Sequence, residues 1–202
     1  MGVSERKTRQ RAEREQRIVA AAAAIAEQEG WDAVTIRRLA EAIEYSQPVL
    51  YSHFANRDAI VAAVAIEGFR EIAAVLRTAV DTDATTDDSL SNIANAYLDF
   101  ASARPALYQA MFVLPTRLRF AEADTRPELR AGFDALASVV APFCPDADVA
   151  TEVFWSALHG MAELERAGRV KPIARQQRIR LISALLASFR DFKPSHATPR
   201  SR

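Results

Sequence analysis

Residues 35–58, TIRRLAEAIEYSQPVLYSHFANRD, decide the fold of this chain. Thr35 and Ser46 are residue types that commonly precede a helix, and apolar residues follow each of them at helical spacing. The sequence therefore predicts two short helices separated by a tight turn. The second carries small, polar and aromatic residues where a buried helix would carry Leu and Ile. This pattern is typical of a helix-turn-helix, which places its second helix in the major groove of DNA.

Two further residues help to fix the ends of these helices. Pro48 falls in the first turn of the second helix, where its missing N–H costs little. Asn56 is a third capping residue, and the apolar spacing after it predicts a long helix over residues 57–79.

A combined pattern of apolar, capping and aromatic residues covers about the first 65 positions. Its members are Ile18, Ala21, Ala22, Gly30, Trp31, Thr35, Ile36, Leu39, Ala40, Ser46, Leu50, Tyr51, His53, Phe54, Arg57, Asp58 and Ile60. This pattern resembles the TetR family of bacterial transcriptional regulators. The resemblance implies an all-α fold, in which an N-terminal three-helix DNA-binding head is joined by a long helix to a C-terminal helical domain for ligand binding and dimerisation.

Two positions depart from the family pattern. Glu44 stands in the turn where the family usually has Gly, and Arg57 stands after the third cap where it usually has Lys. A residue other than Gly in a left-handed turn costs roughly 1–2 kcal/mol, and Glu44 also adds negative charge near the DNA. The Arg is a mild change for a phosphate contact.

Charge is balanced over the whole chain but uneven along it. The 26 basic and 26 acidic residues leave no net charge, so no overall field attracts nucleic acid. The first 17 residues, however, hold Arg6, Lys7, Arg9, Arg11, Arg14 and Arg17 against Glu5, Glu13 and Glu15. Such a basic arm commonly lies along phosphates or reaches the minor groove. The alternative is a solvated, disordered tail.

The rest of the chain has the spacing of helices. We predict loops over residues 80–89 and 115–124, a break at Arg104-Pro105, and a helix opened by Pro127. The domain prediction is a DNA-binding domain over residues 1–55, a helical ligand-binding and dimerisation domain over 56–192, and a disordered tail over 193–202.

The last two predicted helices, about residues 149–166 and 172–192, are apolar over much of their circumference. The residues are Val153, Phe154, Trp155, Leu158, Met161 and Leu164, then Ile179, Ile182, Leu185, Leu186 and Phe189. Helices this apolar in a small protein must bury more than one face. We therefore predict a homodimer through a four-helix bundle. The alternative is an interior helix pair of a monomer.

A second, narrower resemblance covers most of residues 90–170. Its residues are Arg104 to Tyr108, Met111-Phe112, Phe154-Trp155, Leu158-His159-Gly160, Leu164-Glu165 and Ala167-Gly168-Arg169. They look like the TetR subgroup whose regulatory domain carries a Trp-His-Gly motif. The ligands of that subgroup are diverse, so the resemblance implies a domain and not an inducer.

The candidate DNA-binding residues follow from the two short helices. They are Thr35, Arg38, Ser46, Gln47, Pro48, Val49, Tyr51, His53 and Arg57. Gln can pair with an adenine edge and Val can contact a thymine methyl group, so Gln47 and Val49 are candidates for base contacts. Thr35, Arg38, His53 and Arg57 are candidates for phosphate contacts, and the family resemblance implies the same for Tyr51. The alternatives are plain surface positions and, for His53, local packing.

Aromatic and polarizable residues on several helices are the candidate ligand contacts. They are Tyr97, Phe100, Tyr108, Met111, Phe112, Phe133, Trp155 and His159. Together they favour a mostly apolar pocket with few polar anchors, although such residues are also ordinary core. His159 is either a donor to a ligand or a cap on a core carbonyl.

Other chemistries find little support in the sequence. Six scattered glycines form no phosphate loop, and no motif couples Cys144, the only cysteine, to a base. The three histidines have no ligand spacing with Cys144, so we predict no enzyme, no metal and no cofactor. The single cysteine fits a reducing cytosol, and no apolar run is long enough to span a membrane, so the expected location is cytoplasmic.

These features lead to one functional prediction and one alternative. The prediction is a repressor that binds a palindromic, double-stranded DNA operator as a homodimer and is released by a small-molecule inducer. The alternative is a helical dimer that binds a small molecule or a protein partner, with a DNA-binding head weakened by Glu44 and Glu41.

Overall fold

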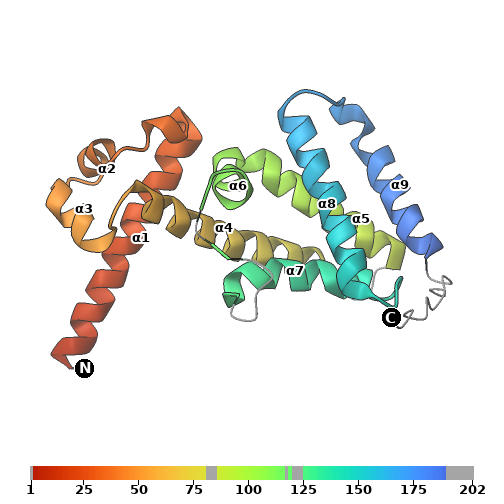
Figure 1. Cartoon of the computed structure of the whole chain (residues 1–202), viewed down its shortest axis with the longest axis horizontal. Helices are drawn as coiled ribbons and strands as arrows, with labels where there is room; N and C mark the ends of the chain where they lie inside the picture. Colours follow the sequence, from red (N-terminus) through yellow and green to blue (C-terminus); the bar gives the residue numbers. More distant parts are fainter. Residues whose placement is uncertain (1, 81–85, 117, 120–124, 190–202) are drawn as a thin grey trace, which may run out of the picture. The chain divides into compact units, whose positions relative to one another are not determined.

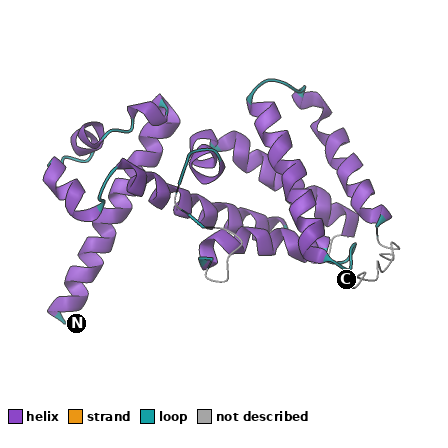
Figure 2. Ribbon diagram, in the orientation of Figure 1, coloured by secondary structure: helices purple, strands orange, loops and turns teal. Residues whose placement is uncertain are grey.

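The computed structural model describes residues 2–80, 86–116, 118–119 and 125–189. Over these ranges the chain is built from helices and loops, without strands (Figure 2). The all-α prediction is therefore confirmed. No helix in the described part is long and apolar enough to cross a membrane.

The N-terminal helices follow the predicted order. They are α1 (Val3–Glu29), the 3₁₀ turn η1 (Trp31–Ala33), α2 (Ile36–Ala42), α3 (Gln47–His53) and α4 (Arg57–Ala79), and α2 and α3 lie beside α1 (Figure 1). The Thr35 hydroxyl accepts a hydrogen bond from the Arg38 N–H at 3.1 Å. The Asn56 side-chain carbonyl accepts one from the Ala59 N–H at 2.9 Å. Ser46 occupies the capping position of α3, but its side chain makes no capping bond.

The basic N-terminal segment is helical. Residues 3–17 form the first half of α1, so the basic arm is helical and the alternative of a disordered tail does not describe it. Ion pairs between residues one turn apart, Arg9–Glu13 and Arg11–Glu15, support the helix in this segment.

The C-terminal helices are α5 (Thr86–Ala103), α6 (Pro105–Phe112), α7 (Pro127–Val140), α8 (Ala147–Arg166), a 3₁₀ turn η2 (Pro172–Ala174) and α9 (Arg175–Ser188). The breaks at Arg104-Pro105 and Pro127 are confirmed. The loop predicted over residues 80–89 is wrong from Thr86 onward, because Thr and acidic residues are also favoured at helix N-termini. The last α-helix is shorter than predicted, because Pro172 opens a 3₁₀ turn and Phe189 is the C-terminal cap. The predicted tail lies outside the described residues.

The chain divides into two compact units. The first comprises Met1–Val75 and Asp99–Gly132, and the second comprises Leu76–Leu98 and Phe133–Arg202. The buried core of the first unit includes Ile18, Ala22, Trp31, Leu39, Leu50, Ile60, Val64, Phe69, Leu107 and Met111. That of the second includes Leu90, Ile93, Tyr97, Leu136, Val140, Phe143, Phe154, Leu158 and Ile179. These units are defined by internal contacts and not by function. The DNA-binding domain over residues 1–55 therefore stays a functional prediction.

Candidate functional site

Helix α3 is held by Leu50 and His53 and leaves most of its other side chains in solvent. Leu50 is fully buried, and it is the only buried residue within this seven-residue helix. Gln47 and Pro48 are exposed, Val49 is half-buried, and Tyr51 is 53% exposed. The predicted base-contact positions therefore lie on the accessible part of the helix.

The turn between α2 and α3 is strained. Glu44 adopts φ 56°, and it is the only residue other than Gly with positive φ among the described residues. The Tyr45 N–H closes the turn by donating to the Ala40 carbonyl at 3.0 Å. The left-handed conformation expected at Glu44 is therefore present, with a charged and exposed side chain at the position.

Arg57 is engaged inside the protein. Its Nε donates to the Val34 carbonyl at 2.8 Å and its Nη2 to the Trp31 carbonyl at 2.6 Å. The guanidinium thereby joins the first turn of α4 to η1. This engagement favours a structural role, and the predicted phosphate contact of Arg57 receives no support from the geometry.

His53 also has a local partner. Its side chain is 6% exposed, and Nδ1 lies 3.2 Å from a carboxylate oxygen of Glu15 on α1. Burial of Glu15 opposes ionisation, but hydrogen bonds with His53 and Arg11 outweigh it and lower the pKa of that carboxyl. The packing alternative is therefore favoured for His53.

Arg38 and Thr35 remain near the surface at the start of α2. Arg38 Nη2 lies 2.7 Å from Glu29, with both side chains about 40% exposed (41% and 39%). An exposed pair of this kind is worth about 0–1 kcal/mol, so phosphate can compete for the guanidinium. Thr35 uses its hydroxyl oxygen as an acceptor for the Arg38 N–H, which leaves the O–H as a donor.

A clasp between α1 and α6 lies within the first unit and has no counterpart in the sequence predictions. The Glu27 carboxylate accepts hydrogen bonds at 3.1 Å from the N–H groups of both Ala106 and Leu107, in the first turn of α6. The buried Trp31 indole donates to the Ala106 carbonyl at 2.8 Å. Local sequence carries no signal for these contacts, because they join residues 75 to 80 positions apart.

The candidate ligand residues divide between the two units. Phe100, Tyr108, Met111 and Phe112 lie in the first and Tyr97, Phe133, Trp155 and His159 in the second. In the first unit Tyr108 and Phe112 pack with ring centroids 4.8 Å apart. Gly68 makes room for Met111, since a Cβ at Gly68 would lie 2.6 Å from its sulfur. Tyr108 and Phe112 thus pack together on α6, and Met111 of the same helix lies against α4.

In the second unit, the aromatic residues of the candidate set other than Phe133 also carry hydrogen-bonding atoms. The Trp155 indole N–H donates to the Tyr97 hydroxyl at 3.0 Å. His159 lies one turn further along α8 and is half-buried. Burial lowers the pKa of His159, partly opposed by the nearby Glu163 carboxylate. A neutral imidazole can both donate and accept a hydrogen bond.

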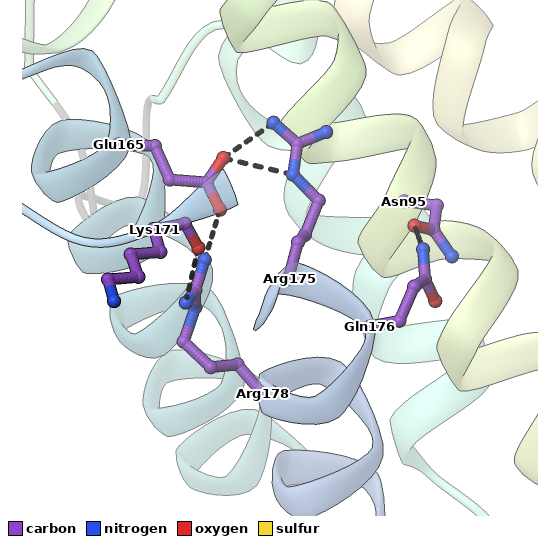
Figure 3. A network of polar contacts seen from close by, with 6 residues as sticks. All are labelled: Asn95, Glu165, Lys171, Arg175, Gln176 and Arg178. Atoms are coloured by element: carbon purple, nitrogen blue, oxygen red, sulfur yellow. Dashed lines mark hydrogen bonds and ion pairs between the residues drawn. The ribbon is translucent and has the colours of Figure 1, made fainter. Parts of the chain in front are cut away.

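An ion-pair network fastens α9 to α8 (Figure 3). The Glu165 carboxylate, 8% exposed, receives hydrogen bonds from Arg175 and from Arg178, the latter at 2.6 Å. Burial raises the pKa of Glu165, but the two guanidinium groups outweigh it and lower the pKa below its usual value. Gln176 donates to the Asn95 side-chain carbonyl at 2.6 Å, which connects α9 to α5.

The outer faces of α8 and α9 are apolar and exposed. Val149, Val153 and Leu164 on α8 are 54%, 62% and 47% exposed. Leu181 and Leu185 on α9 are 63% and 56% exposed. Of the apolar residues predicted to be covered, five are buried within the protomer: Phe154, Leu158, Met161, Ile179 and Leu186. We call the exposed set Val149, Val153, Leu164, Leu181 and Leu185 the α8–α9 apolar face.

Comparison with known proteins places this geometry in a family. The family description "Bacterial regulatory proteins, tetR family" matches residues 18–64, and "Tetracyclin repressor-like, C-terminal domain" matches residues 90–189. The HTH-type transcriptional regulator Rv0681 of Mycobacterium tuberculosis is 30% identical over 154 residues, which are 75% of this chain and 69% of that protein. The chain belongs to the TetR family.

Two solved structures share the fold. A protein of unknown function from Rhodococcus sp. RHA1 has a TM-score of 0.70 at 24% identity, over 86% of this chain and 93% of its own. A TetR variant of Acinetobacter baumannii, solved in complex with minocycline, has a TM-score of 0.63 at 20% identity, over 88% and 97%.

Membership in the TetR family answers the broad functional questions. TetR-family proteins are non-enzymatic DNA-binding regulators that generally respond to a ligand and act as repressors. The chain is therefore a DNA-binding transcriptional regulator. The Trp-His-Gly subgroup stays a prediction.

Proposed function

We propose that this TetR-family regulator is a homodimeric repressor that holds one α3 of each protomer in successive major grooves of a palindromic operator and is released by a small molecule. The observation that carries the proposal is the exposed face of α3. Leu50 and His53 anchor this helix from within, and Gln47, Pro48 and Tyr51 are left in solvent. A helix with this distribution is suited to contact base edges.

The DNA contacts divide into two kinds. Gln47 and Val49 contact bases, while Tyr51, Thr35 and Arg38 contact phosphates. Ser46 and Pro48 set the start of α3, and Pro48 needs no N–H partner there. His53 and Arg57 are left out of the contact set, because each already binds a group inside the protein.

The second copy covers the α8–α9 apolar face. Exposed apolar side chains on two neighbouring helices are suited to pack against a symmetry mate as a four-helix bundle. Dimerisation places two copies of α3 on one duplex. A separation of roughly 34–36 Å, one DNA turn, would fit a palindrome.

The ligand contacts centre on the second unit. Tyr97, Trp155 and His159 combine apolar rings with hydrogen-bonding atoms, which suits a mostly apolar molecule with a polar group. The aromatic cluster around Tyr108 and Phe112 is a second set of candidate contacts. The minocycline complex of the Acinetobacter protein supports only the general point that this fold can hold a small molecule.

Release requires that ligand and DNA favour different states of the protein. Within the first unit, the clasp of Glu27 and Trp31 on the first turn of α6 connects α6 to the helices that carry α3. A ligand that contacts the Tyr108 and Phe112 rings of α6 and displaces this helix would therefore move the end of α1. Because binding free energies are linked, the operator must weaken ligand binding by the same factor as the ligand weakens operator binding.

The test is a mobility shift with DNA from upstream of the protein's own reading frame, across a series of salt concentrations. We expect binding selective for a palindrome and weakening steeply with salt, and selectivity reduced in Gln47→Ala. Equal affinity for unrelated DNA by the wild type would overturn the proposal. A regulator of this kind works where the chromosome is, so we place it in the cytoplasm.

One observation favours a second candidate function. Glu44 strains the turn and puts a negative charge near α3, which fits a helical dimer that binds a small molecule or protein and has a weakened head. Absence of DNA binding in the wild type, restored in Glu44→Gly, would favour that function over active repression.

A further inference from the structure

The first half of α1 carries exposed positive charge beyond the part of the helix that packs in the core. Burial on α1 begins at Ile18, and residues 4–17 are exposed apart from half-buried Glu15. In Figure 1 this end of α1 (red) projects past α2 and α3. These turns bury almost no apolar surface, so the first unit gains little hydrophobic stability from their length.

The positive charges lie on one side of the helix. Lys7, Arg11 and Arg14 follow at intervals of four and three residues, and Arg6 and Arg17 flank them at the neighbouring positions. With 3.6 residues per turn these five form a continuous stripe. Arg9 lies about 60° beyond Arg6, outside this stripe and about 140° from Arg14, and is paired with Glu13 at 3.7 Å.

Contacts with α3 fix the direction of this segment. Arg11 Nη2 donates to the Ser52 carbonyl at 3.4 Å and its Nε to Glu15 at 2.9 Å, while Glu15 contacts His53. Arg11 and Glu15 thus tie α1 to the C-terminal end of α3. Among the described residues, Arg6, Lys7 and Arg14 have no acidic partner and keep their full charge for an outside group.

From these observations we infer that the helical extension of α1 is a second DNA-binding surface, on which Arg6, Lys7 and Arg14 contact the phosphates that flank the bases met by α3. The inference rests on the proposed function, because it uses the same DNA. The stripe from Arg6 to Arg17 is about 16 Å long at 1.5 Å per residue. Duplex DNA presents one charge per roughly 1.7 Å, so the stripe can follow about five base pairs.

The contacts are phosphate contacts and add affinity without adding sequence preference. This distinguishes the stripe from α3, where loss of a side chain should lower selectivity. It also explains how a chain with no net charge can bind a polyanion: the positive charge is concentrated beside the recognition helix.

The experiment compares the wild type with the triple variant Arg6→Gln, Lys7→Gln, Arg14→Gln on operator and on unrelated DNA. Gln is a good helix former, and circular dichroism checks that helix content is kept. The slope of log affinity against log salt should become shallower by about 5, since each phosphate contact contributes about 0.9 and a dimer loses six charges. The ratio of operator to unrelated affinity should stay within about twofold.

Two single variants provide a matched control. Arg14→Gln and Arg9→Gln each remove one charge from the same helix, but only Arg14 lies on the stripe. Arg14→Gln should make the slope shallower by about 1 to 2, and Arg9→Gln should leave it nearly unchanged. Hydroxyl-radical cleavage should show wild-type protection of the flanking backbone that the triple variant loses.

The outcomes separate this inference from the proposed function. A wild type that binds its operator, with a triple variant of the same slope and affinity, would overturn the second surface alone. Equal losses in Arg9→Gln and Arg14→Gln would also overturn it, because the effect would then be one of net charge. A wild type that binds vesicles containing phosphatidylserine through these residues, with an unchanged operator slope, would assign the stripe to a membrane surface. A wild type without DNA binding would overturn both proposals.

Discussion

Helix α3 and the α8–α9 pair both leave a face uncovered, but the two faces differ in chemistry. On α3 the exposed residues are Gln47, Pro48, Tyr51 and Ser52, on a helix anchored by Leu50 and His53. On α8 and α9 the exposed residues include Val153 and Leu181, each more than 60% exposed (62% and 63%). Isolated exposed apolar residues are ordinary, whereas a continuous apolar face marks an interface. The chemistry of each uncovered face therefore indicates its partner. For α3 this is a hydrated polyanion, and for α8–α9 it is the same apolar face of a second protomer.

The largest effect is expected when charge is placed on the α8–α9 apolar face. We expect Leu181→Glu with Leu185→Glu to raise the dimer dissociation constant by about a thousandfold or more, equivalent to about 4 kcal/mol, because two central apolar contacts are replaced by buried charge. Sedimentation equilibrium measures this shift. The control is Val113→Glu, a change at an exposed residue of the other unit, which should leave the dimer intact. Dimers of unchanged strength in the double variant would place the interface elsewhere.

The ion-pair network that fastens α9 to α8 can be tested separately from the apolar face. Glu165→Gln should lower the free energy of unfolding by about 3 kcal/mol, because it leaves Arg175 and Arg178 without their carboxylate. Glu163→Gln, on the same helix, removes only the more exposed pair with Arg166 and should cost less than about 1 kcal/mol. Urea denaturation compares the two. Similar losses would mean that the Glu165 network is no stronger than an ordinary surface pair.

A substitution on the exposed face of α3 should change DNA affinity and not folding. Gln47→Ala should weaken operator binding by about 1–3 kcal/mol and relax the preference at one base position. Ser52→Ala is the control, because the Ser52 hydroxyl is already bonded to the Val49 carbonyl. Fluorescence anisotropy with operators that differ at single positions gives both values. An equal loss on all sequences would reassign Gln47 to phosphate.

The backbone strain at Glu44, in the turn before α3, should be visible in the stability of the protein. Glu44→Gly should raise the free energy of unfolding by about 1 kcal/mol, since Gly relieves the positive φ but loses some entropy on folding. Glu41→Gly, inside α2, should lower it by about 1 kcal/mol. Thermal denaturation measures both. A loss of stability in Glu44→Gly would show that the Glu side chain contributes more than the strain costs.

The smallest expected effect concerns His159. Its folded pKa is lowered by burial, so the unfolded state binds more protons between that value and about 6.5, and stability is lost as pH falls through this window. Because the ring is only half-buried, solvent screening keeps the effect below about 1 kcal/mol. Denaturation curves measured between pH 7.5 and about 5.5 give the free energy of unfolding at each pH. This free energy should fall less steeply for His159→Gln than for the wild type as the pH is lowered. A steeper fall in the variant would contradict a lowered pKa.

The sequence predicted what depends on neighbouring residues. The starts of α2 and α4 follow from Thr35 and Asn56, the end of α5 from Pro105 and the start of α7 from Pro127. The positive φ of Glu44 follows from the family resemblance, because the family usually has Gly at this place in the turn. The start of α5 was missed, since Thr and acidic residues favour loops and helix N-termini alike.

Contacts between distant residues could not be predicted in this way. Nothing in the order of residues shows that Glu27 caps α6 or that Arg57 binds the carbonyls of Trp31 and Val34. Arg57 was assigned to phosphate because an Arg beside a recognition helix is chemically suited to it. The three-dimensional structure shows that buried carbonyls already hold its guanidinium. The same limit applies to the N-terminal segment, whose helical form and contact with Ser52 depend on packing.

The central claim is that the two uncovered faces act together, so that a dimer formed through α8–α9 positions two copies of α3 on one palindrome. The most direct measurement is native mass spectrometry of the protein on a palindromic operator and on the same DNA with one half-site scrambled, for the wild type and for Leu181→Glu with Leu185→Glu. We predict two wild-type protomers on the palindrome, much weaker binding to the single half-site, and no stable complex for the double variant. Binding of the double variant to the palindrome with wild-type strength and one protomer per half-site would contradict the account.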